Sequence, residues 1–299
     1  MRYNKIQILF ILAFSALTWT ACDKIDEPVK IINVQDIPDN LADTLFFTDS
    51  VWVAQKQVLL EEFTGHKCVN CAEQSIAAHE LSEENDHRLV IYSIHAGFYA
   101  QVDETGDYTT DHTSATGIKI FQNFLEPFNP TATINRVDYN GSQVIFPNLW
   151  VTVFEQELAK ENVANMLVKN SWFPNLSSVL IEVNTTFLQN LEGKYKLVVM
   201  IAEDHVTAPQ KNNNAAIGPT PDWLDYDHRN ILRDAITPVF GSYITADGTI
   251  VANEVYTNTF FYAPNADWTT SNCNIIAYVI HEETGEVIQT AELGIKTTE

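Results

Sequence analysis

The chain has 299 residues, of which 45% are hydrophobic, and its 39 acidic and 17 basic side chains give a net charge of −22. An anionic surface of this kind repels phosphate backbones and anionic lipids, so no nucleic-acid partner is expected. The hydrophobic content is sufficient for ordinary buried cores, and the length predicts about two domains.

The N-terminus has the pattern of an export signal. A short basic start precedes an apolar run, Ile6–Leu17, which is too short to span a bilayer, and small or polar residues follow up to Cys22. This segment resembles a bacterial lipobox, which implies that residues 1–21 are removed and that Cys22 is lipidated. The alternative is ordinary cleavage near Ala21, with Cys22 as a plain residue.

Export determines the environment in which the chain folds. The mature chain of 278 residues, with a net charge of −24 after the loss of Arg2 and Lys5, folds outside the cytoplasm, where disulfides persist. Lipidation at Cys22 would anchor it to a membrane. We therefore expect an extracytoplasmic lipoprotein anchored to a membrane.

The next segment predicts a βαβ unit. A short β-rich run at 57–63 is followed by a Cys-x-x-Cys pair, Cys68 and Cys71, and then by a helical stripe at 71–85. The apolar run 88–96 is long enough for a buried parallel strand. The cysteines thus lie between the first strand and the helix, where open α/β sheets place their sites.

The rest of the chain changes from mixed to β-rich patterns. We predict a polar insertion at 97–117, a short helix at 118–126, a hairpin at 128–146 turning at Asn140-Gly141, an amphipathic helix at 147–167 and a long loop at 205–230. Strands are predicted at 177–187, 194–204, 248–257, 258–263, 273–283 and 286–293. Repeated short strands of this kind are typical of a sandwich.

Three interpretations of the cysteine pair compete. A zinc site needs about four ligands, but Cys273 is far away in the sequence, and His66 and His95 lack metal-ligand spacing, so no metal site is predicted. A purely structural bridge would close a very small loop, so its entropic stabilisation would be small. The sequence therefore favours a redox dithiol at Cys68 and Cys71.

The residues around the pair suit disulfide exchange. At a helix N-terminus and beside Lys67, Cys68 would be stabilised as a thiolate nucleophile. A more buried Cys71 would resolve a mixed disulfide. His66 could add charge or shuttle protons, and His95, at the end of a strand, could support the site.

The stretch "VLLEEFTGHKCVNCAEQ" resembles the active-site segment of thioredoxin-like proteins. The resemblance implies that Glu62 is a buried acid that exchanges protons with the second cysteine, and burial would raise its pKa. Because side chains alternate along a strand, we expect Glu62 to face inward and Glu61 outward. It also implies a cis-proline at Pro130 that presents backbone to a substrate, flanked by Asn129 and Thr131. An ordinary trans proline is the alternative.

A wider resemblance covers most of the mature chain. The segments "EEFTGHKCVNC", "IHAG", "NPTATINR", "DHRNILRDAI" and "NIIAYVIHEETGEVIQTAEL" together resemble the outer membrane protein 28-related lipoprotein family of Bacteroidetes. This implies an α/β thioredoxin-like domain followed by an all-β immunoglobulin-like sandwich domain. It also implies an outer-membrane lipoprotein that is either periplasmic or surface-exposed. The corresponding division is a signal peptide at 1–21, a tether at 22–50, and domains at 51–168 and 169–299.

Other chemistry-bearing segments have plainer interpretations. Cys273 alternates with apolar residues and is interpreted as a core thiol. The acids of 97–117 lack the EF-hand order, which favours a solvated loop over a calcium site. The aromatic and Arg-rich stretch 219–236 is either an interaction surface or a packed loop. There is no Walker loop or dinucleotide fingerprint, so no cofactor is expected.

Two functions follow. The leading hypothesis is a membrane-anchored extracytoplasmic lipoprotein that acts as a thiol-disulfide oxidoreductase on cysteine-containing envelope proteins. The alternative is a surface-exposed binding or adhesion lipoprotein on a redox-inactive thioredoxin-like scaffold. Lys67 and Val69-Asn70 depart from the usual thioredoxin pattern and leave room for the second.

Overall fold

A computed structural model describes residue 41 and residues 45–246 and 249–298. The predicted signal peptide, Cys22 and most of the predicted tether lie outside the described residues. All described residues belong to one compact unit. Within them, no helix is both long enough and apolar enough to cross a membrane.

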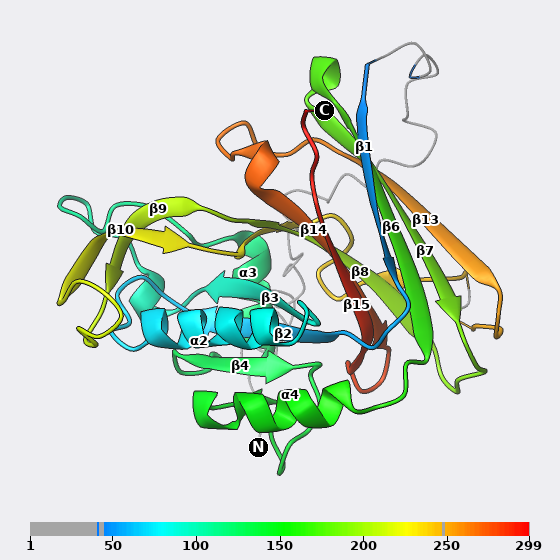
Figure 1. Cartoon of the computed structure of the whole chain (residues 1–299), viewed down its shortest axis with the longest axis horizontal. Helices are drawn as coiled ribbons and strands as arrows, with labels where there is room; N and C mark the ends of the chain where they lie inside the picture. Colours follow the sequence, from blue (N-terminus) through cyan, green and yellow to red (C-terminus); the bar gives the residue numbers. More distant parts are fainter. Residues whose placement is uncertain (1–40, 42–44, 247–248, 299) are drawn as a thin grey trace, which may run out of the picture. The chain divides into compact units, whose positions relative to one another are not determined.

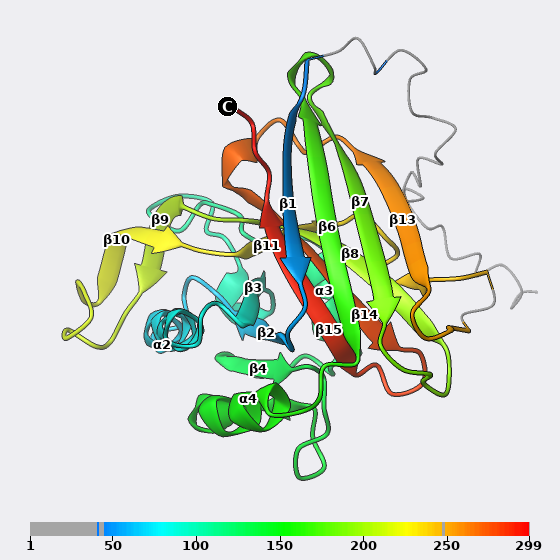
Figure 2. The same ribbon diagram turned by 45° about the vertical axis from the view of Figure 1, so that its right-hand side comes forward.

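The strands form two large sheets and a small ribbon (Figures 1 and 2). The four-stranded antiparallel sheet has the order β1 (Phe47–Val53), β6 (Ala164–Phe173), β7 (Ser178–Phe187), β13 (Val255–Tyr262). The larger sheet has the order β15 (Val287–Gly294), β14 (Cys273–His281), β8 (Tyr195–Glu203), β11 (Ile231–Ala235), β3 (Leu89–His95), β2 (Val58–Thr64), β4 (Thr131–Ile134), β5 (Val144–Ile145), with β12 (Ser242–Tyr243) on β8. The ribbon pairs β9 (Val206–Lys211) with β10 (Asp222–His228).

The helices in the described part of the chain are few and short. The α-helices are α2 (Cys71–Glu84), α3 (Ala115–Asn123) and α4 (Trp150–Leu158). The 3-10 turns are η3 (Phe98–Ala100), η4 (Pro147–Leu149), η5 (Pro174–Leu176) and η6 (Thr270–Asn272). Figure 1 shows α2 lying along β2, with α4 beneath β4.

The predicted βαβ unit is present locally. Strands β2 and β3 pair in parallel from Val58 opposite Leu89 to Thr64 opposite His95, and α2 connects them. The predicted hairpin is also confirmed, because β4 pairs antiparallel with β5 and both turn residues, Asn140 and Gly141, have positive φ. These elements bring the cysteine pair to the carboxyl edge of β2.

Three hydrophobic cores hold the elements together. Strand β8 contributes side chains to two of them. Leu197, Val199 and Ile201 point into the core between the two large sheets. Val198 and Met200 point to the opposite face, into the core shared with β2, β3 and α3. Alternation with period two explains how one apolar run serves both cores. A third core joins β2 and β3 to α2 and α4.

The predicted fold class is wrong. The described chain is mostly β-sheet in several sheets, which conflicts with an α/β thioredoxin-like domain followed by a separate sandwich. The larger sheet runs without interruption from β15 through β8 and β3 to β5, so strands expected in two folds share one ladder of hydrogen bonds. Strand β1 joins the sheet of β6, β7 and β13, and β6 itself spans residue 168. Long-range strand pairing therefore outweighs the local patterns.

Three element predictions also need correction. The helix expected over 147–167 ends at Leu158, and β6 begins at Ala164 because its alternate side chains are buried against the partner sheet. The loop expected at 205–230 contains β9 and β10. In the described part of 248–263, the two expected strands are one, β13.

Candidate functional site

The cysteine pair forms a disulfide at the start of α2. Cys68 and Cys71 are bonded, with 5.4 Å between their Cα atoms. The helix begins at Cys71, and the Asn70 side chain makes no capping hydrogen bond. Cys68 lies in the preceding turn, where its N–H donates to the Gly65 carbonyl over 2.9 Å. The expectation that Cys68 opens the helix is therefore shifted by one turn.

Both cysteines are buried, contrary to the expected asymmetry. Cys68 is 3% exposed and Cys71 1%. The cover comes from the ribbon and the residues after β9. The Gln210 side-chain amide donates to the Cys68 carbonyl over 2.9 Å, and the Asn213 N–H donates to the Val69 carbonyl over 3.1 Å. Figures 1 and 2 both show the ribbon beside the N-terminal end of α2.

The charge beside the pair is partly neutralised. Lys67 forms an ion pair with Asp103 of the insertion, with 2.6 Å between Nζ and Oδ1. The insertion also contacts the ribbon, where the Tyr108 hydroxyl donates to Asp222 over 2.6 Å. The acidic insertion is thus held to Lys67 and to the ribbon at two points, while its acidic residues stay exposed, as expected of a solvated acidic loop.

Glu62 is fully buried near the second cysteine. Burial raises the pKa of its carboxyl to about 7, opposed by the hydroxyls of Ser93 and Ser75. Ser93 Oγ donates to Glu62 Oε2 over 2.8 Å, while Oε1 has no partner among the described residues. A carboxyl with this pKa is close to half-protonated at pH 7, which suits it to accept and return a proton.

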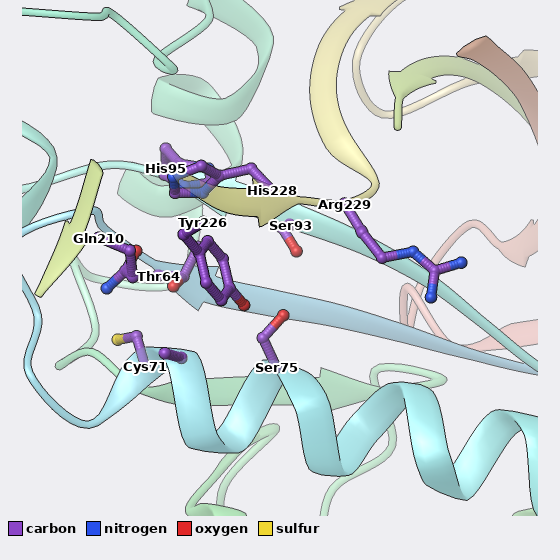
Figure 3. Close-up of a pocket in the computed structure, with 10 residues that line it drawn as sticks. Thr64, Cys71, Ser75, Ser93, His95, Gln210, Tyr226, His228 and Arg229 are labelled. Carbon is purple, nitrogen blue, oxygen red and sulfur yellow. The ribbon is translucent and has the colours of Figure 1, made fainter. Parts of the chain in front are cut away.

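A cavity of about 10 Å³, enough for one water molecule, lies between Cys71 and the two serines that contact Glu62, Ser75 and Ser93. Ser75, Ser93, Tyr226 and Cys71 are among its lining residues. Figure 3 shows the side chains of Ser75 and Tyr226 approaching each other across it. The two serine hydroxyls therefore connect the carboxyl to the space beside Cys71.

Glu61 has a different role from the one expected. It is as buried as Glu62, because β2 is covered on both faces. Arg136 forms a bidentate ion pair with the Glu61 carboxylate, with Nε 2.6 Å from Oε2 and Nη2 2.7 Å from Oε1. Thr133 and Tyr92 also donate to this carboxylate. Burial of Glu61 acts to raise the pKa of its carboxyl, but the Arg136 charge and the hydrogen bonds from Arg136, Thr133 and Tyr92 together outweigh it, so the pKa is lowered.

The predicted proline segment lies at the end of β2. The Asn129–Pro130 peptide bond is cis, as expected. The Asn129 amide donates to the Thr64 carbonyl over 2.7 Å, and Thr131 Oγ1 donates to the Phe128 carbonyl over 2.6 Å. Both flanking side chains therefore support the loop.

Pro130 lines an open groove beside the disulfide. The groove encloses about 560 Å³, and its walls include Asn70 and Gln74 on one side and Phe128 and Phe146 on the other. The two phenylalanines are 84% and 60% exposed. Asn70 lies between the two cysteines in sequence, so a chain bound in the groove would lie against the cysteine loop.

Four histidines gather behind the disulfide. The predicted residues His66 and His95 are joined by His112 of the insertion and His228 of β10, and all four are buried. Burial lowers the pKa of each, to about 2 for His112 and about 4 for His228, so the rings are neutral at pH 7. The sequence offered His112 only within the acidic insertion and His228 only within the aromatic and Arg-rich stretch 219–236. It does not group the four histidines, because they come from separate segments with no common spacing.

The remaining predictions concern the β-rich half. Cys273 is a free thiol with no exposed surface, and burial raises the pKa of that thiol to about 12, which confirms the core interpretation. The stretch 219–236 is mostly exposed up to residue 225 and mostly packed from Tyr226 onward, where Arg233 Nε lies 2.8 Å from Glu203 Oε2. Gln210, Ser75 and Ser93 were also missed, since single polar residues carry no pattern.

The arrangement can support two kinds of chemistry. A disulfide beside a proton-exchanging carboxyl and an open groove can exchange with a thiol, provided that the ribbon opens. The same disulfide, covered as it is, can also serve as a fixed structural link.

Comparison with known proteins identifies a family through one family model and a similar fold through a solved structure. The family described as outer membrane protein Omp28 matches residues 123–299. The solved structure of HBP35 of Porphyromonas gingivalis is similar, with a TM-score of 0.59 and 13% identity over 82% of this chain and 77% of that one. A domain of the outer membrane lipoprotein Omp28 from Porphyromonas gingivalis is 18% identical over 40% of this chain and 77% of that one, with a TM-score of 0.25. No curated protein matches the chain.

Proposed function

This chain belongs to the Omp28 family of outer membrane proteins, and from that membership we propose that it is a lipid-anchored envelope protein whose Cys68–Cys71 disulfide exchanges with protein thiols. The family places it outside the cytoplasm and at the outer membrane. The proposed partners are cysteine-containing envelope proteins, and the proposed anchor is lipidated Cys22.

The observation that carries the proposal is the disulfide beside a buried carboxyl whose pKa is about 7. A substrate thiolate attacks Cys68 Sγ, a mixed disulfide forms, and Cys71 leaves as a thiolate. A second substrate thiolate then attacks the substrate sulfur and releases Cys68. The substrate dithiol loses two electrons to the protein disulfide, and the released thiolates take up the two substrate protons.

Glu62 gives the leaving thiolate a proton source. Its neutral form can pass a proton through Ser75 or Ser93 into the cavity beside Cys71. Because the pKa of Glu62 is near 7, the same carboxyl can recover the proton without a large free-energy cost. In the reverse direction, the carboxylate accepts the proton from Cys71.

The groove supplies a place for the substrate chain. Phe128 and Phe146 offer apolar surface, while Asn70 and Gln74 offer amides. A segment of extended peptide lying between them would bring its cysteine close to the cysteine loop. The groove therefore favours a protein substrate over a small thiol.

Trapping tests the proposal. Exchange is reversible, so in a Cys71→Ser variant the free Cys68 thiolate should attack a disulfide of an envelope protein. Without Cys71 to resolve them, the mixed disulfides should accumulate and disappear on reduction. The variant with both Cys68→Ser and Cys71→Ser is the matched control, since it retains buried Cys273. If the single variant traps no more protein than the double variant, thiol exchange is refuted.

The burial of both cysteines favours a second candidate function. A disulfide whose two members are 3% and 1% exposed is shielded from thiols, as expected if it only fixes the loop of a binding or adhesion protein. In that case the double variant should fold and retain surface binding. Protease treatment of intact cells adds to the test, because a chain cleaved at the surface has few reductant partners outside the cell.

A further inference from the structure

Four histidine rings form a contiguous buried cluster that the proposed thiol chemistry does not use. They come from the loop after β2 (His66), the end of β3 (His95), the insertion (His112) and the end of β10 (His228). Their exposed fractions are 1%, 4%, 1% and 3%. Ring centroids are 4.4 Å apart for His112–His228, 5.0 Å for His95–His112, 5.5 Å for His95–His228 and 5.7 Å for His66–His112.

Four ring nitrogens of this cluster are buried and have no hydrogen-bond partner among the described residues. These atoms are His95 Nδ1, both nitrogens of His112, and His228 Nε2. Buried side-chain polar atoms are nearly always satisfied in folded proteins, and a group of exceptions in one place indicates a ligand or a chemical role. His112 is the clearest case, because it is 1% exposed and unpartnered at both nitrogens.

Backbone carbonyls fix the tautomers of two rings. His66 Nε2 lies 3.1 Å from the Gln101 carbonyl, and His228 donates to the carbonyls of Pro209 and Ala208. A carbonyl can only accept, so these ring nitrogens carry the proton and the opposite nitrogen of each ring keeps its lone pair. Metal-binding histidines in proteins are held in this way, with one nitrogen on a carbonyl and the other on the ion.

From this cluster we propose that His95, His112 and His228, with His66 as the fourth ligand, bind one divalent ion of the zinc class. Zinc lies about 2 Å from each imidazole nitrogen, which places the centroids of rings in a tetrahedral site about 5 Å apart. The three separations among His95, His112 and His228, from 4.4 to 5.5 Å, bracket this spacing, and His66 lies 5.7 Å from His112. Imidazole ligands suit zinc, copper and nickel, and exclude calcium and magnesium as the preferred ions.

Binding requires the rings to turn. In the described chain, no group of three or more His, Cys, Asp or Glu side chains is already arranged to hold a metal ion. The spacing of the rings is set by β3, β10 and the insertion, whereas rotation about the side-chain bonds redirects the nitrogens. The ion would thus tie the insertion to the ribbon, behind the cavity lined by Cys71, His95 and His228 (Figure 3).

Metal titration tests the site. The purified full chain, without a histidine tag, stripped by a chelator and kept oxidised, is titrated with Zn²⁺, and with Co²⁺ as a visible probe. We expect one ion per chain, tetrahedral Co²⁺ absorption, and a nitrogen shell at about 2 Å in zinc X-ray absorption. H112Q and H228Q should each weaken binding at least tenfold. His79→Gln is the control, since His79 Nε2 is also unpartnered but lies outside the cluster.

Several results would overturn the proposal. These are the lack of one-to-one binding by the wild-type chain, a zinc shell of sulfur or oxygen only, or equal affinity in H112Q and the wild type. Absorption measured on wild-type protein decides the question even if a variant fails to fold. The outcome is separate from thiol exchange, because the disulfide stays closed throughout.

Discussion

Removing the side chain of Gln210 should expose the disulfide without unfolding the protein. Its amide donates across to the cysteine loop, to the Cys68 carbonyl over 2.9 Å and to the Gly65 carbonyl over 3.4 Å, and the residue is 2% exposed. Two hydrogen bonds at about 1 kcal/mol each amount to about 2 kcal/mol. Since each 1.4 kcal/mol is tenfold in an equilibrium constant, Gln210→Ala should raise the open population of the ribbon roughly 30-fold.

The assay is the rate at which a mild reductant opens Cys68–Cys71, followed by alkylation of the freed thiols. When opening and closing are fast, this rate follows the open population, so it should also rise roughly 30-fold. Gln289→Ala is the matched control, because that buried amide donates to Gln55, Asn162 and Ala164, away from the disulfide. A rise of less than threefold in Gln210→Ala, or an equal rise in the control, would refute local gating.

Three further predictions follow from the site and its surroundings. The pKa of Glu62 is raised from 4.5 to about 7, so the unfolded chain releases this proton at a lower pH than the folded chain, and stability falls as pH rises through that window. Glu62→Gln should therefore gain up to about 3 kcal/mol relative to wild type between pH 5 and 8, measured by denaturant unfolding, while Glu282→Gln, at a partly exposed carboxylate whose pKa is lowered, shows no such gain. Arg136→Met leaves the buried Glu61 carboxylate without its partner and should lower the free energy of unfolding by about 3–5 kcal/mol. Lys169→Met, at a surface ion pair, should lower it by under about 1 kcal/mol, and equal losses in the two variants would contradict this reasoning. Cys22→Ser should move the chain from the membrane to the soluble fraction, and continued membrane attachment would rule out lipidation at that residue.

Local signals in the sequence were sufficient for the elements that carry the disulfide. The apolar runs of β2 and β3 and the Asn140-Gly141 turn each specify their structure within a few residues, and all three are confirmed. The same reasoning failed for β9 and β10. Their polar, Pro- and Asn-rich sequence reads as a loop, and they become strands through pairing with each other across a register shift.

Contacts between distant segments account for the remaining errors. Glu61 is buried because Arg136 neutralises it, and that partner is 75 residues away. The fold class was wrong because β8, β11 and β14 extend the sheet begun by β2 and β3, which no local pattern reveals. The histidine cluster likewise exists only after four segments have come together.

The residues that cover the disulfide are synthesised and exported after the cysteines themselves. Gln210 follows Cys68 by 142 residues, and a chain made from its N-terminus presents the cysteines to the envelope well before the ribbon that will enclose them. Oxidation of the pair therefore meets no barrier during export, whereas reduction afterwards must wait for the ribbon to open. The oxidation state of the buried disulfide is therefore set by the redox conditions during export more than by those around the folded protein.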